Sequence, residues 1–338
     1  MTTISVIIPV YNQEQYISCC LDSLLNQEFK DFQLIIVNDG STDNSQSVIE
    51  TYLNDKRITF INQPNLGVSA ARNCGLDLAK AEWVCFVDPD DYLEKDYLMS
   101  LYQYAMQFSD CDIICTTCNC IIKDKKVRQH FFPENFVAST QKEKIPLYIQ
   151  LMDGKQYQQN AYTGIGVPWA KLYKRDFLHN NGLCFSIDQQ RMQDNLFNMK
   201  AMYAAHKICY IDYAGYNYRV DSLVGRSYRK LIDGAYHSAL DERDKLFHLY
   251  YFDKCPMLLT FFYEEKVNLY YSEFVACVNI FKNIFYAVEC RRKELYKRLI
   301  SIPYRALSIR CKFKLFLIKN KVGNLLFIFI YLVKGKIK

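Results

Sequence analysis

The residues best suited to chemistry are three carboxylates packed into four positions of the segment "FVDPDDYL", residues 86–93. Asp88, Asp90 and Asp91 repel one another unless a positive charge lies among them. They directly follow the apolar run "WVCFV", residues 83–87, which is typical of a buried strand. A loop that only needed to be soluble would carry Ser, Asn or Gly. The crowding therefore predicts that something positive binds here.

Polar loops also follow three other apolar runs in the first part of the chain. "VYN", "DGSTDNS" and "QPNLGVSAARN" come after runs at residues 4–10, 32–38 and 58–62. In an open parallel sheet, ligands bind beyond the carboxyl ends of the strands. The four loops therefore predict one site at one edge of a sheet, although the Asp39-Gly40 pair taken alone is also typical of a simple turn.

The elements that must position these loops alternate in type along the chain. Short β-branched runs at 4–10, 32–38, 58–62 and 82–87 predict buried strands, and amphipathic stretches at 13–26, 43–54 and 68–80 predict helices. This order predicts an α/β fold with an open, parallel sheet and right-handed crossovers. No glycine-rich dinucleotide fingerprint and no P-loop are present. From about residue 230 onward, helical spacing predicts a helical appendage.

The net charge of +6 is unevenly distributed. Residues 291–338 carry a net charge of +13, whereas the remaining residues carry −7. The apolar run 322–333 is shorter than the roughly 20 residues that a membrane-spanning helix needs. It is flanked by lysines at 319, 321, 334, 336 and 338. The tail therefore predicts contact with an anionic membrane surface, with a helix packed on the protein's own core as the alternative. Its apolar fraction argues against nucleic acid.

The expected location is the cytoplasm. "TISVIIPVY" is too short, and too close to a proline, for a signal-peptide core, and no small-residue cleavage site follows it. Fourteen cysteines at scattered spacings favour reduced thiols over a disulfide framework. Together with the basic tail, this predicts a protein peripheral to the inner face of the cell membrane.

Four ordered segments give the chain a specific resemblance. "SVIIPVYNQEQYISCCLDSLLNQ", "LIIVNDGSTDNS", "NLGVSAARNCGL" and "FVDPDDYL" resemble the nucleotide-sugar domain of family 2 glycosyltransferases. The match is tight from residue 4 to about 98 and continues more loosely through "PWAKLYKRDFL", "QDNLFN" and "YAGYNYR". It implies a GT-A fold with a mostly parallel Rossmann-like sheet flanked by helices. It also implies a UDP-sugar donor, a divalent cation, and transfer with inversion at the anomeric carbon.

The resemblance also implies which residues bind the donor. By similarity, Asp39 meets the uridine, because a carboxylate can accept hydrogen bonds from the base or the ribose. Pro9, Tyr11 and Asn12 would line the same nucleotide pocket. Arg72 lies in "VSAARN", and its planar guanidinium suits the diphosphate.

Asp88 and Asp90 match the family's D-x-D motif. Carboxylates and the donor's phosphates together suit a hard cation such as Mn²⁺ or Mg²⁺, which neutralises charge as the nucleotide leaves. Asp88 is expected to contact the donor as well. For Asp91 two interpretations stay open: a direct ligand, or a helix cap or turn residue.

The acceptor side needs one base to take the proton of the attacking hydroxyl. The family's acidic pair matches "RMQDNLFN", where Gln193 replaces the first acid and leaves Asp194 as the expected base, with Asp188 as its competitor. Trp169 and Lys171 fall where related proteins shape the acceptor site. A buried core position is the alternative for Trp169.

The resemblance implies an inverting hexosyl- or N-acetylhexosaminyltransferase that adds one sugar to a saccharide. The acceptor is expected to be lipid-linked, carried on a polyprenyl diphosphate, as in capsule, O-antigen or exopolysaccharide assembly. We expect a GT-A domain at 1–225, with a donor half at 1–125 and an acceptor half at 126–225, and a helical region at 226–338. The alternatives are a processive polysaccharide synthase, for which the Q-x-x-R-W motif is missing, and a non-catalytic sugar-nucleotide-binding protein.

Overall fold

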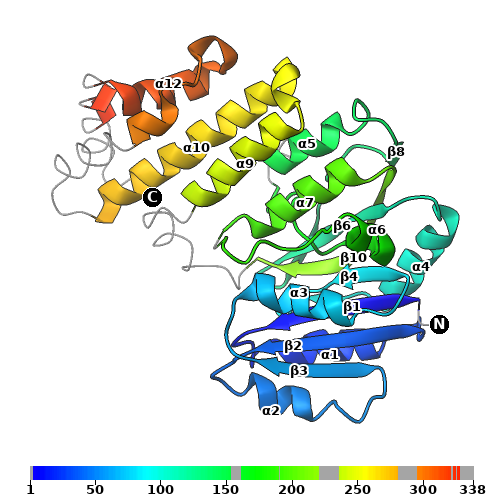
Figure 1. The fold of residues 1–338 in the computed structure, drawn as a ribbon. Helices are drawn as coiled ribbons and strands as arrows, with labels where there is room; N and C mark the ends of the chain where they lie inside the picture. Colours follow the sequence, from blue (N-terminus) through cyan, green and yellow to red (C-terminus); the bar gives the residue numbers. More distant parts are fainter. Residues whose placement is uncertain are drawn as a thin grey trace. The chain divides into compact units, whose positions relative to one another are not determined.

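The computed structural model describes residues 3–153, 161–189, 191–220, 236–280, 295–320, 323–324 and 326–327. The chain divides into two compact units, Met1–Val224 and Gly225–Lys338 (Figure 1). The sequence placed the boundary between residues 225 and 226. The two units are described separately below.

The described strands of the first unit form one ten-stranded sheet. Its order is β3-β2-β1-β4-β9-β6-β10-β5, with β7 paired to β6 and β8 paired to β10. The strands are β1 (Ile4–Val10), β2 (Phe32–Asp39), β3 (Ile58–Gln63), β4 (Trp83–Phe86), β5 (Tyr92–Leu93), β6 (Ile113–Ile122), β7 (Lys125–Arg128), β8 (Phe136–Ala138), β9 (Lys171–Lys174) and β10 (Ile208–Arg219).

The predicted mostly parallel sheet is confirmed. β3, β2, β1 and β4 pair in parallel, and so do β6 and β10, while β9 is antiparallel to both β4 and β6. Every residue of β1 is buried, because this strand is covered on both faces. β1 and β4 are the neighbours at which the strand order reverses, and loops beyond such a point form a binding crevice.

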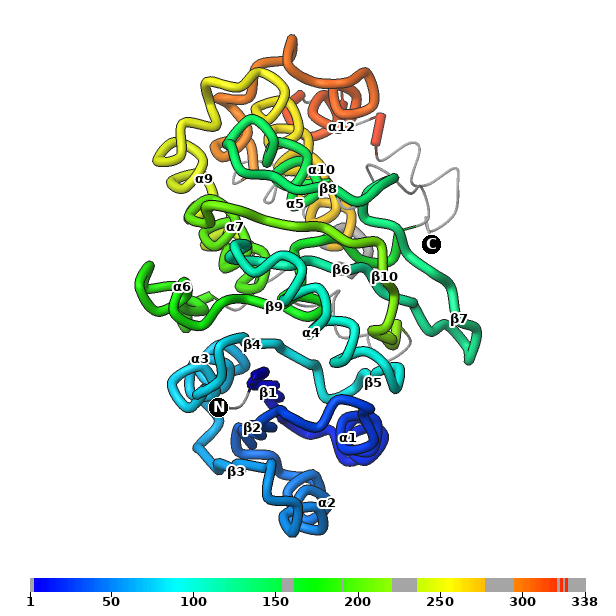
Figure 2. The backbone as a smooth tube through the Cα atoms, turned by 90° about the vertical axis from the view of Figure 1, so that its right-hand side faces the viewer, coloured from blue at the N-terminus to red at the C-terminus, as the bar shows by residue number. Residues whose placement is uncertain are grey.

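Helices cover both faces of the parallel strands. α1 and α3 lie on opposite sides of β1 and β2 in Figures 1 and 2. α3 approaches β1 closely at Gly75, where an added Cβ atom would lie 2.3 Å from Cγ2 of Ile7. The helices of this unit are α1 (Ile17–Leu25), α2 (Ser45–Glu50), α3 (Val68–Leu78), α4 (Tyr97–Gln107), α5 (Ile145–Met152), α6 (Arg175–Asn180) and α7 (Gln193–Ala204).

The second unit is helical in its described part, with α9 (His237–Leu249), η2 (Phe252–Lys254), α10 (Pro256–Ile280), η3 (Tyr304–Ala306) and α12 (Ile309–Lys319). Polar side-chain contacts join α9 to α10: Nε2 of His237 lies 2.7 Å from Oε2 of Glu273, and Nζ of Lys266 lies 2.6 Å from Oδ2 of Asp244. Phe327 is buried, with its ring centroid 4.8 Å from that of Phe274.

The C-terminal tail can be compared with its prediction only in part. Among the described residues, no helix combines the length and hydropathy needed to cross a membrane. Most of the apolar run 322–333, and the lysines at 321, 334, 336 and 338, lie outside the described residues. The described Asn324 and Phe327 are buried, as the packing alternative expects.

Candidate active site

The loop after β4 separates its three carboxylates by exposure. The side chain of Asp88 is 24% exposed and Asp90 is partly exposed, whereas Asp91 is only 1% exposed. Burial, together with the nearby Asp90 and Asp88, raises the pKa of Asp91 well above its usual range. Two of the three carboxylates are therefore accessible to a ligand, and the third belongs to the protein's interior.

Asp91 connects this loop to strand β10. The hydroxyl of Tyr216 donates a hydrogen bond to Oδ2 of Asp91 (2.7 Å) and accepts one from the backbone N–H of Asp88 (3.0 Å). The backbone N–H of Arg219 donates to Oδ1 of Asp91 (2.8 Å). Asp91 does not cap α4, because that helix begins at Tyr97 with Asp96 in the cap position. The helix-cap interpretation of Asp91 is wrong, and its buried, bonded carboxylate argues equally against a direct ligand role.

Arg72 joins the D-x-D loop to the expected base. It extends from α3, with Nη2 2.9 Å from Oδ1 of Asp88 and Nη1 2.5 Å from Oδ1 of Asp194. Its side chain is 3% exposed, and its guanidinium carbon lies 5.2 Å from the ring centroid of Phe185. Two carboxylates that are 106 positions apart in the sequence are thereby brought to one cation.

Asp194 has the setting of a general base. It lies in the first turn of α7, and its side chain is 31% exposed. Burial raises its pKa most, Arg72 lowers it and Asp88 raises it, and the net direction is upward from the ordinary carboxyl value. A raised pKa makes a carboxylate a stronger base, which favours proton abstraction near neutral pH. The competitor Asp188 is exposed and is not one of the partners of Arg72.

The expected nucleotide pocket is built around Asp39, which is 2% exposed. Its Oδ1 accepts hydrogen bonds from Nε2 of Gln63 (2.7 Å) and the N–H of Leu66 (2.9 Å), and its Oδ2 accepts one from the N–H of Gly67 (2.9 Å). Gly67 has a φ of 92°, a backbone conformation that favours glycine. Asp39 therefore fixes the loop between β3 and α3, and its contact with a uridine stays a prediction.

Pro9, Tyr11 and Asn12 lie at the end of β1 and just after it. Pro9 is buried in the sheet, whereas Tyr11 is 43% exposed. Asn12 has a left-handed backbone with a φ of 53°, and its Oδ1 accepts a hydrogen bond from the N–H of Thr42 (2.8 Å). This bond ties the loop after β1 to the loop after β2. Tyr11 is exposed and Asn12 is partly exposed, so these two members of the group are open to a ligand.

Neither of the two residues expected at the acceptor site is exposed for direct contact, and for Trp169 the structure agrees with the buried core alternative. Trp169 is 1% exposed, and its ring stacks on Tyr216 at 4.5 Å and on Tyr218 at 5.1 Å, so a sugar ring cannot reach it. Lys171 is fully buried, and its Nζ donates to the backbone carbonyl of Val167 (2.7 Å). Burial lowers the pKa of Lys171 to about 8. Both side chains lie in the interior of the first unit.

The cation prediction is compatible with the chemistry of these side chains. Of the two carboxylate oxygens of Asp88, Arg72 bonds Oδ1. Oδ2 could therefore bind a cation together with the carboxylate of Asp90, which is partly exposed. Within the described part of the chain, no group of three or more His, Cys, Asp or Glu residues is arranged to hold a metal ion. The two carboxylates suit a hard cation that takes its remaining ligands from phosphates or water.

Sequence reasoning missed two residues that hold this site together. Tyr216 carries the bridging hydroxyl described above, and Asn198 lies one turn after Asp194. Nδ2 of Asn198 donates to the carbonyls of Val167 (3.0 Å) and Asp194 (3.0 Å), and its Oδ1 accepts from the hydroxyl of Tyr173. Their residue types carry no signal of these roles. Only the looser similarity of "YAGYNYR" and "QDNLFN" pointed to these segments.

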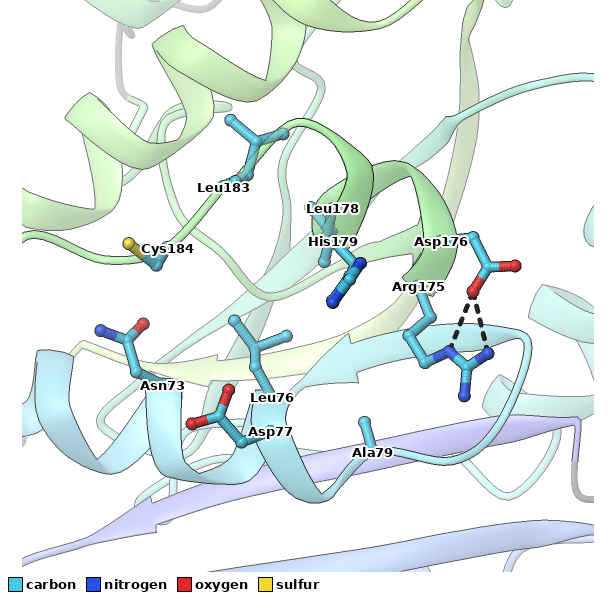
Figure 3. Close-up of a pocket in the computed structure, with 11 residues that line it drawn as sticks. Asn73, Leu76, Asp77, Ala79, Arg175, Asp176, Leu178, His179, Leu183 and Cys184 are labelled. Atoms are coloured by element: carbon cyan, nitrogen blue, oxygen red, sulfur yellow. Dashed lines mark hydrogen bonds and ion pairs between the residues drawn. The ribbon is translucent and has the colours of Figure 1, made fainter.

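A separate cavity of about 800 Å³ lies between α3 and α6 (Figure 3). No predicted site residue lines it. The side chain of Asn73, on its wall, forms hydrogen bonds with both backbone groups of Phe185, and Arg175 is paired with Asp176. Its lining residues are Asn73, Leu76, Asp77, Ala79, Arg175, Asp176, Leu178, His179, Gly182, Leu183 and Cys184.

Comparison with known sequences agrees with the resemblance found in the motifs. The family described as Glycosyl transferase family 2 matches residues 5–181, just over half of the chain. The chain is 32% identical over 237 residues to the putative glycosyltransferase EpsH of Bacillus subtilis, covering 68% of this chain and 65% of that protein. It is 31% identical to glycosyltransferase GlyA of Streptococcus pneumoniae, covering 64% and 30%. The chain thus spans less than two thirds of either relative.

Comparison with solved structures gives the fold. TarS of Staphylococcus aureus, residues 1–349 in complex with UDP-GlcNAc, matches with a TM-score of 0.54 at 22% identity, covering 96% of this chain and 83% of that chain. This similarity shows the GT-A architecture that the motifs predicted. The match covers the strand and loop motifs of residues 4–98 and most of the rest of the chain.

Proposed function

This chain belongs to glycosyl transferase family 2, and on that premise we propose that it transfers one sugar from a UDP-sugar to a hydroxyl of a saccharide acceptor, with inversion. The observation that carries the proposal is the group formed by Asp88, Arg72 and Asp194. In this group, the buried guanidinium of Arg72 pairs with two carboxylates: the accessible Asp88 of the D-x-D motif, and Asp194, whose pKa is raised. An inverting transferase needs these two functions side by side, one for the donor and one for the acceptor.

In the proposed reaction, Asp194 accepts the proton of the acceptor hydroxyl while that oxygen attacks the anomeric carbon. The bond from that carbon to the diphosphate oxygen breaks, its electron pair leaves with UDP, and the proton remains on Asp194. Asp88 and Asp90 would hold Mn²⁺ or Mg²⁺, which neutralises charge on the departing diphosphate. Asp39, Tyr11, Asn12 and Pro9 form the nucleotide end of the site.

UDP is the proposed nucleotide. The segments that follow the first two strands resemble the nucleotide-binding segments of family 2 glycosyltransferases, which supports UDP. In addition, TarS, a protein named poly(ribitol-phosphate) beta-N-acetylglucosaminyltransferase, has been crystallised with UDP and with UDP-GlcNAc. We propose a polyprenyl-diphosphate-linked saccharide as acceptor, in surface-polysaccharide assembly, and action at the inner face of the cell membrane. The net charge of +13 on residues 291–338 supports that location, because it suits anionic lipid.

Replacement of Asp90 with Ala tests the donor site. We expect the variant to lose the Mn²⁺-dependent part of UDP binding, measured by calorimetry with and without Mn²⁺, because one of two accessible carboxylates is gone. Asp77→Ala is the control, since Asp77 is an exposed aspartate on α3. Unchanged Mn²⁺-dependent affinity in Asp90→Ala would count decisively against the cation role. Absence of UDP binding to the wild-type protein would contradict the proposed donor.

A further inference from the structure

Arg72 was predicted to bind the donor diphosphate, but its surroundings indicate another task. The side chain is 3% exposed, and both terminal nitrogens already donate to carboxylates: Nη2 to Asp88 and Nη1 to Asp194. Nε is buried without a hydrogen-bond partner among the described residues. In this arrangement, a diphosphate could reach the guanidinium only by displacing one of the two carboxylates.

The three partners of Arg72 come from three separate parts of the chain. Asp88 follows β4, Asp194 opens α7, and Phe185 lies in the segment between α6 and α7. Phe185 is itself fixed, since its ring stacks on Phe197 at 4.1 Å and its backbone bonds Asn73 on the same helix as Arg72. The guanidinium is therefore held in one place by its own helix and by the segment that leads into α7.

A buried cation in this position constrains both acids. Removing one partner from a buried ion pair is costly, because the remaining charge is left uncompensated. Turning either the Asp194 or the Asp88 carboxylate away from Arg72 would therefore cost free energy, which favours the side-chain conformations seen here. A planar guanidinium, with nitrogens at a fixed spacing, also sets the separation of the two carboxylates, which a lysine ammonium cannot do.

We propose that Arg72 is a positioning residue that holds the base Asp194 in register with the D-x-D residue Asp88, and is not a ligand of the donor diphosphate. The inference rests on the proposed function. It predicts that loss of Arg72 reduces the rate of transfer and leaves donor affinity intact, because Tyr216 still holds the loop backbone and a bound cation can hold the Asp88 carboxylate in place of the guanidinium. A diphosphate ligand would show the opposite pattern.

The test compares Arg72→Gln and Arg72→Lys with Arg57→Gln. Arg57 is a matched control, because it pairs with Asp55 at the opposite end of the parallel strands, next to the start of β3. Two quantities are measured for each protein: the dissociation constant for UDP with Mn²⁺, by calorimetry, and kcat for UDP release. The donor is the fastest of UDP-glucose, UDP-galactose and their N-acetylhexosamine forms. Thermal unfolding reports whether each variant is folded.

We expect Arg72→Gln to lower kcat on the order of 10²-fold, the scale of an approximately 1 Å misplacement of a reacting group, with the UDP dissociation constant within about threefold of wild type. Arg72→Lys should recover part of kcat, because it keeps a cation but can satisfy one carboxylate at a time. If Arg72→Gln does not fold, Arg72→Lys carries the same prediction. Arg57→Gln should match wild type in both quantities.

The Asp194→Asn background makes the test sharper. A residue that acts through Asp194 has little further effect once Asp194 is gone, so Arg72→Gln added to Asp194→Asn should leave the residual rate nearly unchanged. A tenfold or larger weakening of UDP binding in either Arg72 variant, or an unchanged kcat, would overturn the inference. Failure of the wild-type protein to release UDP from any of the four donors would instead contradict the proposed function.

Discussion

At the scale of single residues, the sequence indicated the candidate acids of the site but not what each of them contacts. Motifs and spacing singled out Asp88, Asp90 and Asp194, and the structure brings Asp88 and Asp194 to the same guanidinium, while their roles stay predictions. The burial of Lys171 was not predicted, and for Trp169 a buried core position was one of two open interpretations, since a residue type alone does not show which side chains turn inward. The pairing of Arg72 was equally hidden, because it joins segments that only the folded chain brings together.

The raised pKa of Asp194 gives a prediction for the pH dependence of transfer. Only the deprotonated carboxylate can accept a proton, so kcat should fall as the pH drops through the pKa of Asp194. Because that pKa is raised, the fall should occur above the range of an ordinary aspartate, which is about 3.9. The measurement is kcat at saturating donor as a function of pH. A rate that stays constant down to about pH 4 would argue against Asp194 as the base.

At the scale of elements, the apolar runs predicted the first four strands, β1 to β4, to within one residue at each end. The first helix was predicted from residue 13 but begins at Ile17, because Asn12 adopts a left-handed backbone and residues 13–16 form turns. The antiparallel strand β9, between β4 and β6, was not predicted. Its place depends on long-range pairing, of which a short segment carries little local signal.

The contact between the D-x-D loop and β10 gives a second prediction. Tyr216→Phe removes the hydroxyl that bonds both Asp88 and Asp91, and should lower the free energy of unfolding by about 1–3 kcal/mol, because two buried polar groups lose a partner. Mn²⁺-dependent UDP binding should weaken too, since the loop is no longer fixed. Urea unfolding and calorimetry measure the two effects.

Tyr218→Phe is the matched control for that change. Tyr218 lies on the same strand and its ring stacks on the same tryptophan, but its hydroxyl forms no hydrogen bond with the described residues. We expect this variant to resemble wild type in both measurements. Equal effects of the two substitutions would show that the Tyr216 hydroxyl does not hold the loop.

At the scale of the whole molecule, the chain combines an α/β unit that carries the site with a basic helical unit. Residues 295–320 contain seven basic residues and no acidic one. In α12, Cys311, Leu315 and Ile318 are buried, whereas Ile309 is 86% exposed and Phe313 is 47% exposed. Apolar side chains beside lysines and arginines suit the headgroup region of an anionic membrane.

This exposed face gives a prediction for membrane contact. Replacing Ile309 and Phe313 together with serine should reduce sedimentation of the protein with phosphatidylserine-containing vesicles, and leave its thermal unfolding nearly unchanged. Leu249→Ser is the control, because Leu249 is 66% exposed at the end of α9. Undiminished vesicle binding of the double variant would show that this face of α12 does not contact lipid.

The central claim is that Asp194 is the base of a UDP-sugar transferase, and one comparison tests it most directly. UDP release from UDP-glucose, UDP-galactose, UDP-GlcNAc and UDP-GalNAc is measured with Mn²⁺ for the wild-type protein and for Asp194→Asn. We predict release from at least one donor by the wild type, and a rate lower by about 10²–10⁴-fold in the variant, with Mn²⁺-dependent UDP affinity retained. Undiminished turnover in Asp194→Asn, or no release from any donor by the wild type, would contradict the account.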